Sequence, residues 1–495
     1  MPSIPRCYNT NTAGDTSKLD IFYKLARLAD RDSSQHTSHL AVTHTFNSLH
    51  STLPRMPSSQ TQISSTKEDD ENMKIPGPTS MLSMSAAASS SSSSSGGNYG
   101  IIVGLNGALQ KRCIFPTGGQ LIPGNVHRIA RVEVGIGGKG QDVAIALHCL
   151  GYSESKMAQF LGLGPEGDQV YDMMQGKMGT ASMDLTVRTQ APLRTCTSLV
   201  ASDTTTELVE PSGVISKEEM AELFSKLETK QEDDSSSSKI AALCIMGSMP
   251  PGCSEDTYAK IYQTTIPNKN DKDSPTVCVV DSVAGLEPLL KAMAANPNKN
   301  DKAIFKINAS ELCTLAKVTK TNNEVDGIAQ DELVEAITGF LTETAQKALT
   351  ALAITDGKHP AHLAMLDDAT KGFTLYQLPT ARLDGDQTLF PIGAGDAVAG
   401  GTLAAWQSLL ASSSPAHNCL PPDNLHQALE FHLADNMAVG EEEKDVAILL
   451  SAFAFGLACG SASCLEEENS VLQPKQVLDL FTKTGKPTFL SSHTF

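Results

Sequence analysis

A short glycine-rich turn, Gly393-Ala394-Gly395-Asp396, has the residue types needed to hold an anion and to take a proton. Small residues let backbone N–H groups approach an anion, and the apolar helical stretch that follows adds the partial positive charge of a helix N-terminus. The Asp396 carboxylate could accept a proton from a hydroxyl at the same place. A tight turn with Asp396 as a helix N-cap is the alternative, and the turn by itself does not decide between the two.

A second glycine cluster, Gly135-Ile136-Gly137-Gly138-Lys139-Gly140-Gln141-Asp142, also opens a predicted helix. Glycines at this point would let a ligand approach the backbone closely. Lys139 could meet a phosphate, and Asp142 could bind hydroxyl groups. The spacing differs from the Gly-x4-Gly-Lys-Ser/Thr phosphate-binding loop, and taken alone the cluster is also typical of a plain glycine-rich turn.

Two further motifs follow predicted strands. Lys306-Ile307-Asn308-Ala309-Ser310-Glu311 places an amide and a carboxylate three residues apart on an opening helical turn, where both can face the same way. Oxygen ligands of this kind suit Mg²⁺, although helix capping by Asn308 explains the same pattern. Gly247-Ser248-Met249-Pro250-Pro251-Gly252 comes directly after another strand, where open α/β sheets bind ligands.

Short apolar runs that alternate with helical segments must position these motifs. The predicted strands are residues 101–103, 242–246, 277–281, 304–307 and 352–355. The predicted helices are residues 141–150, 256–262, 333–349 and 397–410. Such an alternation predicts an α/β fold with a mainly parallel central sheet.

The rest of the chain predicts additions to this body. Residues 1–98 form a Ser/Thr-rich leader that buries too little apolar surface to fold, so the folded domain is predicted to be 99–495. Polar–apolar alternation near 105–134 and 185–210 predicts a small antiparallel flap. Polar insertions are predicted near 231–238, 268–274, 296–302 and 412–423.

Charge and cysteine usage narrow the class of protein. The net charge of −18 argues against a broad nucleic-acid-binding face. The 11 cysteines include no C-x-x-C pair, which argues against a disulfide framework or a structural zinc site. No run of about 18 uncharged apolar residues was found, so no transmembrane helix and no membrane partner are expected.

We expect a cytoplasmic protein. The stretch 33–66 has no acidic residue and is rich in Ser, Thr and His, so an organelle-targeting segment is the alternative.

In this order and spacing, the four motifs closely resemble the PfkB (ribokinase-like) carbohydrate kinases. The resemblance extends from about residue 101 into the C-terminal region. Gly247-Ser248-Met249-Pro250-Pro251-Gly252 and Leu105-Asn106-Gly107-Ala108-Leu109-Gln110 are most similar to the branch with 1-phosphofructokinase and tagatose-6-phosphate kinase. The resemblance implies a three-layer α/β/α sandwich with a small β-sheet lid, and use of ATP and Mg²⁺.

The resemblance also implies roles for individual residues. Asp396 matches the catalytic base, with an anion hole made by Gly393, Ala394 and Gly395. Asn308 and Glu311 match the pair that organises Mg²⁺. The substrate side is matched by Asn106, Gln110, Gly137, Gly138, Lys139, Asp142 and Arg194, the last a lid arginine that can meet a substrate phosphate. The nucleotide side is matched by Thr355, Asp356, Gly357, Ala458, Gly460 and Ser461.

Two positions depart from the family pattern. The family usually has aspartate where Gln110 stands and asparagine where Asp142 stands, so an amide and a carboxylate have changed places. Either Asp142 supplies the lost charge and a polyol still binds, or sugar binding has decayed.

Three hypotheses therefore stand: a kinase for a sugar phosphate of the hexose-phosphate type, a kinase for an unphosphorylated sugar or nucleoside, and a non-catalytic scaffold with the kinase fold. By resemblance, a homodimer through the lid is also expected.

Overall fold

The computed structural model describes residues 99–152, 155–202, 204–233, 240–266, 276–298, 300–319, 327–383, 389–411, 423–436 and 444–494. The predicted leader and the predicted insertion at 268–274 lie outside these residues, as do 234–238 and 412–422 of two other predicted insertions. The predicted insertion at 296–302 is the connection between helix α6 (Leu286–Ala294) and strand β10 (Lys302–Asn308).

Among the described residues, the main sheet has ten strands. The strands from β5 to β11 in sheet order run parallel, and three antiparallel strands extend the sheet beyond β11. The order is β14 (Thr488–His493), β13 (Gly372–Leu378), β12 (His359–Asp367), β11 (Ala351–Asp356), β10, β9 (Val277–Asp281), β8 (Ile240–Met246), β1 (Tyr99–Val103), β4 (Ser155–Gly162) and β5 (Thr186–Thr189).

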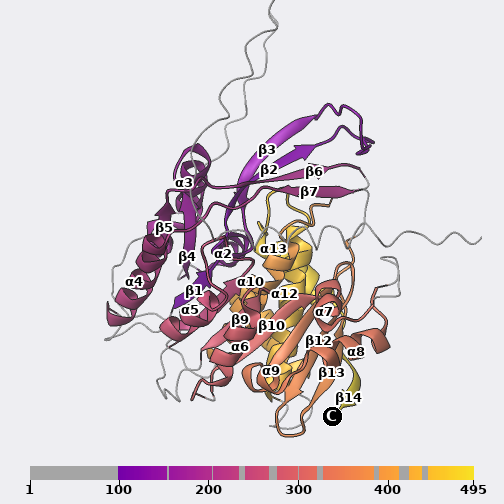
Figure 1. Ribbon diagram of the computed structural model, residues 1–495. Coiled ribbons are helices and arrows are strands. Elements are labelled where there is room, and N and C mark those ends of the chain that lie inside the picture. Colours follow the sequence, from indigo (N-terminus) through magenta and orange to yellow (C-terminus); the bar gives the residue numbers. More distant parts are fainter. Residues whose placement is uncertain are drawn as a thin grey trace, which may run out of the picture. The chain divides into compact units, whose positions relative to one another are not determined.

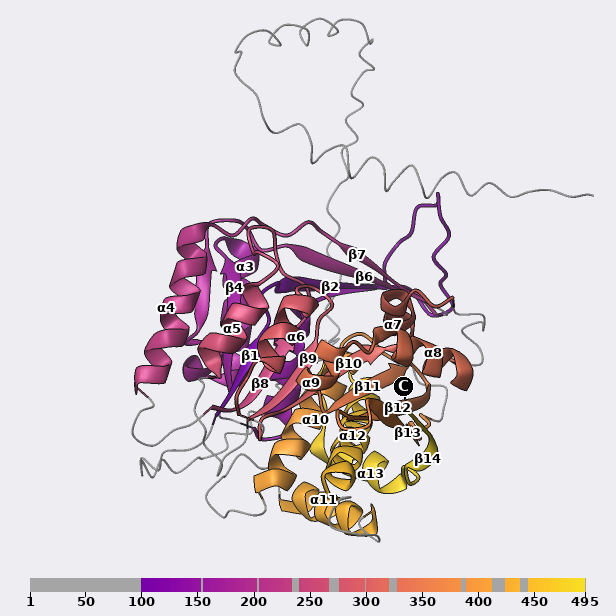
Figure 2. The same cartoon turned by 60° about the horizontal axis from the view of Figure 1, so that its bottom comes forward.

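Successive residues of the central strands enter different cores because side chains alternate between the two faces of a sheet. Ile102 packs into one hydrophobic core, whereas Ile101 and Val103 pack into the other. Helices cover both faces, so the predicted three-layer α/β/α sandwich is confirmed (Figures 1 and 2).

The helices divide between the two cores. The core that contains Ile102 includes residues of α2 (Lys139–Cys149), α3 (Pro165–Met178), the 3₁₀ helix η1 (Thr180–Met183), α10 (Ala394–Ala411), α11 (Asp423–Asn436), α12 (Lys444–Ser463) and α13 (Pro474–Lys483). The other core includes residues of α4 (Lys217–Asp233), α5 (Thr257–Thr265), α6, α7 (Ala309–Ala316), α8 (Gln330–Phe340) and α9 (Glu343–Ala348).

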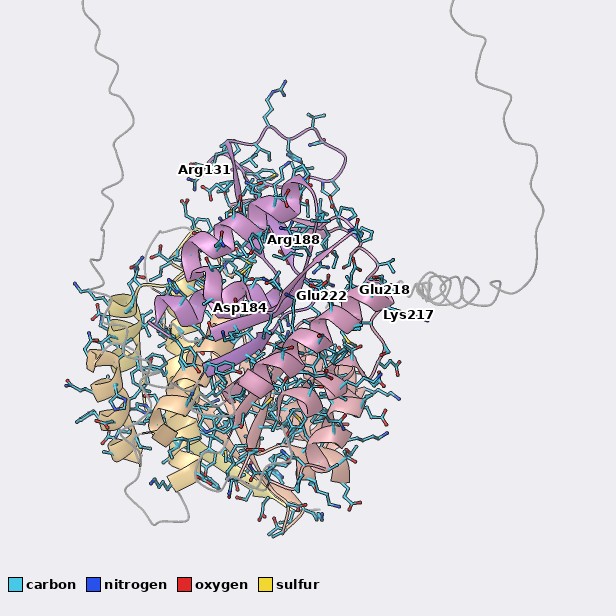
Figure 3. All side chains as sticks on the ribbon, turned by 90° about the vertical axis from the view of Figure 1, so that its left-hand side faces the viewer. Arg131, Asp184, Arg188, Lys217, Glu218 and Glu222 are labelled. Atoms are coloured by element: carbon cyan, nitrogen blue, oxygen red, sulfur yellow. The ribbon has the colours of Figure 1, made fainter. Side chains whose placement is uncertain are left out.

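Helix α4 shows how an outer helix meets the sheet. Leu223 and Leu227 are buried in the core. The charged residues labelled in Figure 3 on the same helix, Lys217, Glu218 and Glu222, are exposed. This division is the amphipathic pattern of a surface helix, so the helix needs no further partner to bury its apolar face.

A second, smaller sheet forms the lid, in the order β3 (Arg131–Gly137), β2 (Ala108–Ile114), β6 (Thr195–Val200) and β7 (Thr205–Val209) (Figure 1). It is not purely antiparallel as predicted, because β2 and β6 run parallel. The segment near 185–210 also reaches beyond the lid, since β5 pairs with β4 in the main sheet.

The predicted helix at 333–349 is two helices, α8 and α9. Thr342 has extended backbone dihedrals, and its hydroxyl accepts a hydrogen bond from the Ala345 backbone N–H at 3.2 Å. Such N-capping starts a new helix at Glu343. The apolar periodicity alone runs through this break, which is why the prediction joined the two segments.

Helix α12 is longer and more apolar than the sequence analysis allowed for. Within the described residues it is the one helix long and apolar enough to cross a membrane by length and composition. However, 94% of its most apolar stretch is buried inside the protein, in the core beside α10.

Glycines let α10 and α12 approach each other closely. A Cβ atom added at Gly456 would lie 2.1 Å from the Thr402 hydroxyl oxygen and 2.6 Å from the Val398 carbonyl oxygen. A Cβ atom added at Gly460 would lie 2.5 Å from a methyl carbon of Val398. The two helices could not keep this crossing with any larger residue at these positions.

Replacing one of these glycines tests the crossing. We expect Gly456→Ala to lower the free energy of unfolding by about 1–3 kcal/mol, because the added methyl forces the helices apart. The control is Gly176→Ala on α3, where an added Cβ meets nothing within 4 Å. It should raise that free energy by about 0.5–1 kcal/mol. Urea unfolding of both variants is the measurement, and equal effects would contradict the crossing.

Candidate active site

A cleft with a volume of about 720 Å³ lies where several parallel strands end. Its walls include Met246 at the end of β8, Asp281 at the end of β9 and Asn308 at the end of β10. Residues of the lid strands β2, β6 and β7 line it as well. Ligands of open α/β sheets bind at this edge of the sheet.

The predicted catalytic turn borders this cleft. Gly393, Gly395 and Asp396 line it, with Ala394 between them at the first position of α10. Because the helix begins at Ala394, Asp396 lies in its first turn and is not the N-cap that the alternative reading required. The partial positive charge of the helix N-terminus is therefore directed at the cleft beside Asp396.

A buried cluster of charges lies beside the turn. The Asp281 carboxylate accepts hydrogen bonds from the ammonium groups of Lys139 at 2.7 Å and Lys306 at 2.5 Å. Burial alone would raise the pKa of Asp281, but the two lysines hold it below its usual range. Burial opposes the charge of Lys139, yet Asp281 outweighs it and raises the pKa of that lysine. Asp281 and Lys139 are therefore charged at neutral pH.

Asp396 has a different electrostatic environment. Burial raises its pKa, and the negative charge of Asp281 raises it further. Lys139 and Lys306 oppose this shift, and the result is a pKa of about 7. A carboxyl group with this pKa can take a proton near neutral pH, which is the property a general base needs.

Gly395 lies close to the ammonium group of Lys306. A Cβ atom at this position would lie 3.2 Å from the Lys306 ammonium nitrogen, closer than an ordinary contact. Lys306 reaches the first turn of α10 from strand β10 because alternate residues of that strand face the helix. The glycine thus allows a buried cation beneath the catalytic turn.

On the substrate side, Asn106, Ser248 and Arg194 form a polar group. The Asn106 side-chain amide donates to the Ser248 hydroxyl at 2.9 Å. The Arg194 guanidinium donates to the Asn106 backbone carbonyl at 2.9 Å, so one edge of it is fixed while the side chain lines the cleft. Arg128, another arginine of the lid region, is exposed on the β2–β3 connection and does not line the cleft.

Gln110 and Asp142, the exchanged pair, both line the cleft and are almost fully buried. The Gln110 amide donates to the Ser198 hydroxyl at 2.6 Å. Asp142 has one carboxylate oxygen that is buried without a hydrogen-bond partner among the described residues. Burial, Asp396 and Glu207 raise its pKa well above the usual range. A ligand hydroxyl would satisfy the unpartnered oxygen.

The second glycine cluster serves packing as well as the cleft. Gly138 and Lys139 line the cleft. A Cβ atom at Gly138 would lie 3.0 Å from the Gly107 Cα atom, and the φ angle of Gly138 is 116°. Gly137 ends β3, where an added Cβ would lie 3.0 Å from the Gln110 side-chain oxygen. The glycines therefore bring the start of α2 close to the chain that follows β1.

Asn308 and Glu311 are consistent with both interpretations of their motif, Mg²⁺ binding and helix capping. They form a reciprocal cap at the start of α7, in which the Asn308 side chain accepts from the Glu311 N–H and Glu311 accepts from the Asn308 N–H. Both also line the cleft. The cap uses one carboxylate oxygen of Glu311, which leaves acceptor capacity for Mg²⁺ or its bound waters. These oxygen ligands fit Mg²⁺, which usually takes only a few ligands from the protein in addition to phosphate oxygens.

The predicted nucleotide residues do not all meet at the cleft. Thr355 lines it, but Gly357 forms the tight turn between β11 and β12 with a φ angle of 60°. The Asp356 carboxylate accepts from the Ile328 N–H at 2.7 Å. The three predicted residues of α12 are buried in this structure, in the packing against α10: Ala458, Gly460 and Ser461. A nucleotide contact by them stays a prediction.

The sequence analysis missed several residues of the cleft. Asp281 and Lys306 interrupt or end buried apolar strands, and a charged residue at such a place was the available signal. Glu207 and Asn469 also line the cleft. Glu207 lies in a polar lid strand and Asn469 in a late loop, so no local pattern singled them out.

The site agrees with comparisons to known proteins. The chain matches the pfkB family carbohydrate kinase over residues 107–420. It belongs to that family. The predicted family membership and the prediction of a carbohydrate kinase are thereby confirmed. No curated protein sequence matches the chain.

Solved structures show the same fold at low sequence identity. A possible 1-phosphofructokinase from Thermotoga maritima is 15% identical, with 80% of this chain and 100% of that chain covered and a TM-score of 0.53. Phosphofructokinase-2 from Escherichia coli, in complex with fructose-6-phosphate, is 18% identical, with coverage of 78% and 98% and a TM-score of 0.51. Both are fold relatives of this pfkB-family kinase.

The electrostatics of Asp396 predict a pH dependence. A base must be deprotonated, so kcat/KM should rise with pH through about 7, the pKa of Asp396 in the free enzyme. Asp281→Asn removes the anion that raises this pKa and leaves both lysines, so the acid limb should move to lower pH. The position of the acid limb is measured from initial rates between pH 5 and 9, in steps of roughly half a pH unit. An upward shift, or none, would contradict the assigned charge arrangement.

Proposed function

We propose that the chain is an ATP-dependent phosphotransferase that moves the γ-phosphoryl group to a hydroxyl of a sugar phosphate of the hexose-phosphate type. The observation that carries the proposal is Asp396, a buried carboxyl group with a pKa of about 7 at the N-terminus of α10. It lies in one cleft with two ammonium groups, those of Lys139 and Lys306.

The residues divide the work of phosphoryl transfer. Asp396 orients the acceptor hydroxyl and takes its proton as the new oxygen–phosphorus bond forms and ADP leaves. Backbone N–H groups of Gly395 and its neighbours, at the helix N-terminus, stabilise the charge on the transferring group. Lys139 and Lys306 add positive charge in a site of restricted solvent access, where it acts more strongly than in water.

ATP and Mg²⁺ are part of the proposal. Bound Mg²⁺ would neutralise phosphate charge and help orient the donor. Asn308 and Glu311 would hold it, and the donor would lie toward β11, where Thr355 lines the cleft. The opposite side, under the lid, is left for the acceptor.

A phosphorylated acceptor is supported by the Asn106, Ser248 and Arg194 group. It offers a guanidinium, a hydroxyl and an amide at the end of the cleft away from Thr355, and such donors suit a phosphate. The fold relative from Escherichia coli was solved with fructose-6-phosphate. Against this, Glu207 and Asp142 bring acidic groups to the same side. They favour the second candidate, an unphosphorylated sugar or nucleoside.

A homodimer through the lid is proposed with the activity. Val132, Val134 and Leu208 lie on the outer face of the lid sheet and expose 51%, 41% and 54% of their surface. The strand register places all three on the face opposite Gln110. An exposed apolar group of this kind is typical of an association surface.

Substitution of the proposed base tests the activity. Asp396→Asn should lower kcat by about 10²–10⁴-fold, since the amide cannot take a proton. The assay is phosphate transfer from ATP across a panel of sugars and phosphosugars, with ATP binding measured by calorimetry. Full activity of the variant would overturn the role of Asp396. Lack of turnover by the wild type on every acceptor would favour a non-catalytic scaffold.

Substitution of the lid arginine separates the two acceptor classes. Arg194→Ala should raise KM for a phosphosugar by about tenfold or more, because a charge-assisted contact to the phosphate is lost. The KM for ATP should stay within about twofold, since no donor contact is removed. Arg128→Ala is the matched control, because that exposed arginine does not line the cleft. An unchanged phosphosugar KM would favour the unphosphorylated acceptor.

A further inference from the structure

The loop that follows α12, residues 464–471, touches the catalytic turn directly; we name it the clasp loop. The Ser470 hydroxyl donates to the Gly393 carbonyl oxygen at 2.8 Å. At the other end of the loop, the Cys464 carbonyl accepts from the Phe390 N–H at 2.9 Å. The segment that leads into α10 is thus held at two points by residues more than seventy positions later in the chain.

The contact between Ser470 and Gly393 leaves no spare room. A Cβ atom at Gly393 would lie 2.6 Å from the Ser470 hydroxyl oxygen, and the φ angle of Gly393 is 83°. Ser470 is completely buried and has a φ angle of 54°, which is uncommon for a residue other than glycine. The Gly393 carbonyl that it binds also accepts from the Asp396 and Ala397 N–H groups. Ser470 therefore helps set the geometry of the first turn of α10.

The clasp loop also contacts the lid from its other side. Arg112 of β2 is buried, and its guanidinium donates to the Glu467 backbone carbonyl and to the Asn469 side chain at 3.4 Å. Arg112 lies two residues after Gln110, on the same face of the strand, because side chains alternate. A strand that lines the cleft through Gln110 is therefore joined to the loop that holds Gly393.

We infer that Arg112 and Ser470 are positioning residues that couple the lid to the catalytic turn through the clasp loop. The path runs from the lid strand β2, through Arg112, to Glu467 and Asn469, and then through Ser470 to the Gly393 carbonyl. An acceptor seated against the lid stabilises the arrangement of the turn that Asp396 needs. The kinetic part of this inference rests on the proposed function, whereas the structural part does not.

Arg131 supplies a matched comparison on the same lid. Its guanidinium pairs with the Glu467 carboxylate at 2.5 Å, but 49% of the side chain is exposed. In Figure 3 Arg131 lies toward the lid end of the molecule. Exposed ion pairs contribute little to stability. Removal of a buried arginine, by contrast, leaves the carbonyl and amide groups that it bound without a hydrogen-bond partner. The coupling is therefore assigned to Arg112 and not to Arg131.

The structural test is hydrogen–deuterium exchange of the full chain without ligands. Arg112→Met keeps an unbranched side chain in place of the aliphatic stem and removes the donors. We expect exchange at the amides of residues 392–397 to be about threefold faster or more, because the turn opens more often. Ser470→Ala should do the same, and Arg131→Met should leave the exchange unchanged. Unchanged exchange in Arg112→Met, or an equal increase in Arg131→Met, would overturn the coupling.

The kinetic test is a double-mutant cycle on kcat at saturating substrates. Arg112→Met and Ser470→Ala should each lower kcat by about tenfold, with KM for ATP within about twofold, since a displaced turn slows the transfer without changing donor binding. The double variant should be no slower than the slower single variant, because both act on one path. Multiplied losses would show independent effects and overturn the inference.

The two tests can refute the proposed function and the coupling independently of each other. A wild-type protein inactive on every acceptor would refute the proposed function, and the exchange measurement would still decide the coupling. An active wild type with unchanged exchange in Arg112→Met would refute the coupling alone.

Discussion

The site depends on one buried negative charge, that of Asp281, held between Lys139 and Lys306. A charge cannot be taken out of water unless it is paired, so the buried Asp281 and Lys306 must meet, and the partly exposed Lys139 joins them. They come from the end of β9, the start of α2 and the end of β10. Their meeting fixes how one helix and two strands converge beside Asp396, and together with burial it sets the proton affinity of that group.

The same constraint gives the glycines their positions. A buried ammonium group beneath the first turn of α10 leaves little space for a side chain at Gly395. The clasp loop on the opposite side leaves none at Gly393. The anion-binding character of the turn and its close packing are therefore two results of one geometry. A glycine-rich motif can therefore be a ligand site and a tight turn at the same time.

Local sequence predicted the elements and the turns that border the cleft. Asp396, Lys139 and Asn308 follow glycine or strand-end signals within a few residues, and all three line the cleft. What the sequence could not predict depends on long-range pairing. The partner of Lys139 is Asp281, 142 positions away. The apolar periodicity continues through Thr342 and therefore does not indicate the helix break there. The break depends on a single capping hydroxyl.

The clasp loop has a consequence for how the enzyme is made. Strands β1 to β11 and the turn at Gly393 leave the ribosome before residues 464–471, and the family match itself ends at residue 420. Until then, α10 lacks both the apolar face of α12 and the hydroxyl of Ser470. A nascent chain can therefore form its acceptor side early, but its catalytic turn is assembled only after residues 464–471 have been synthesised.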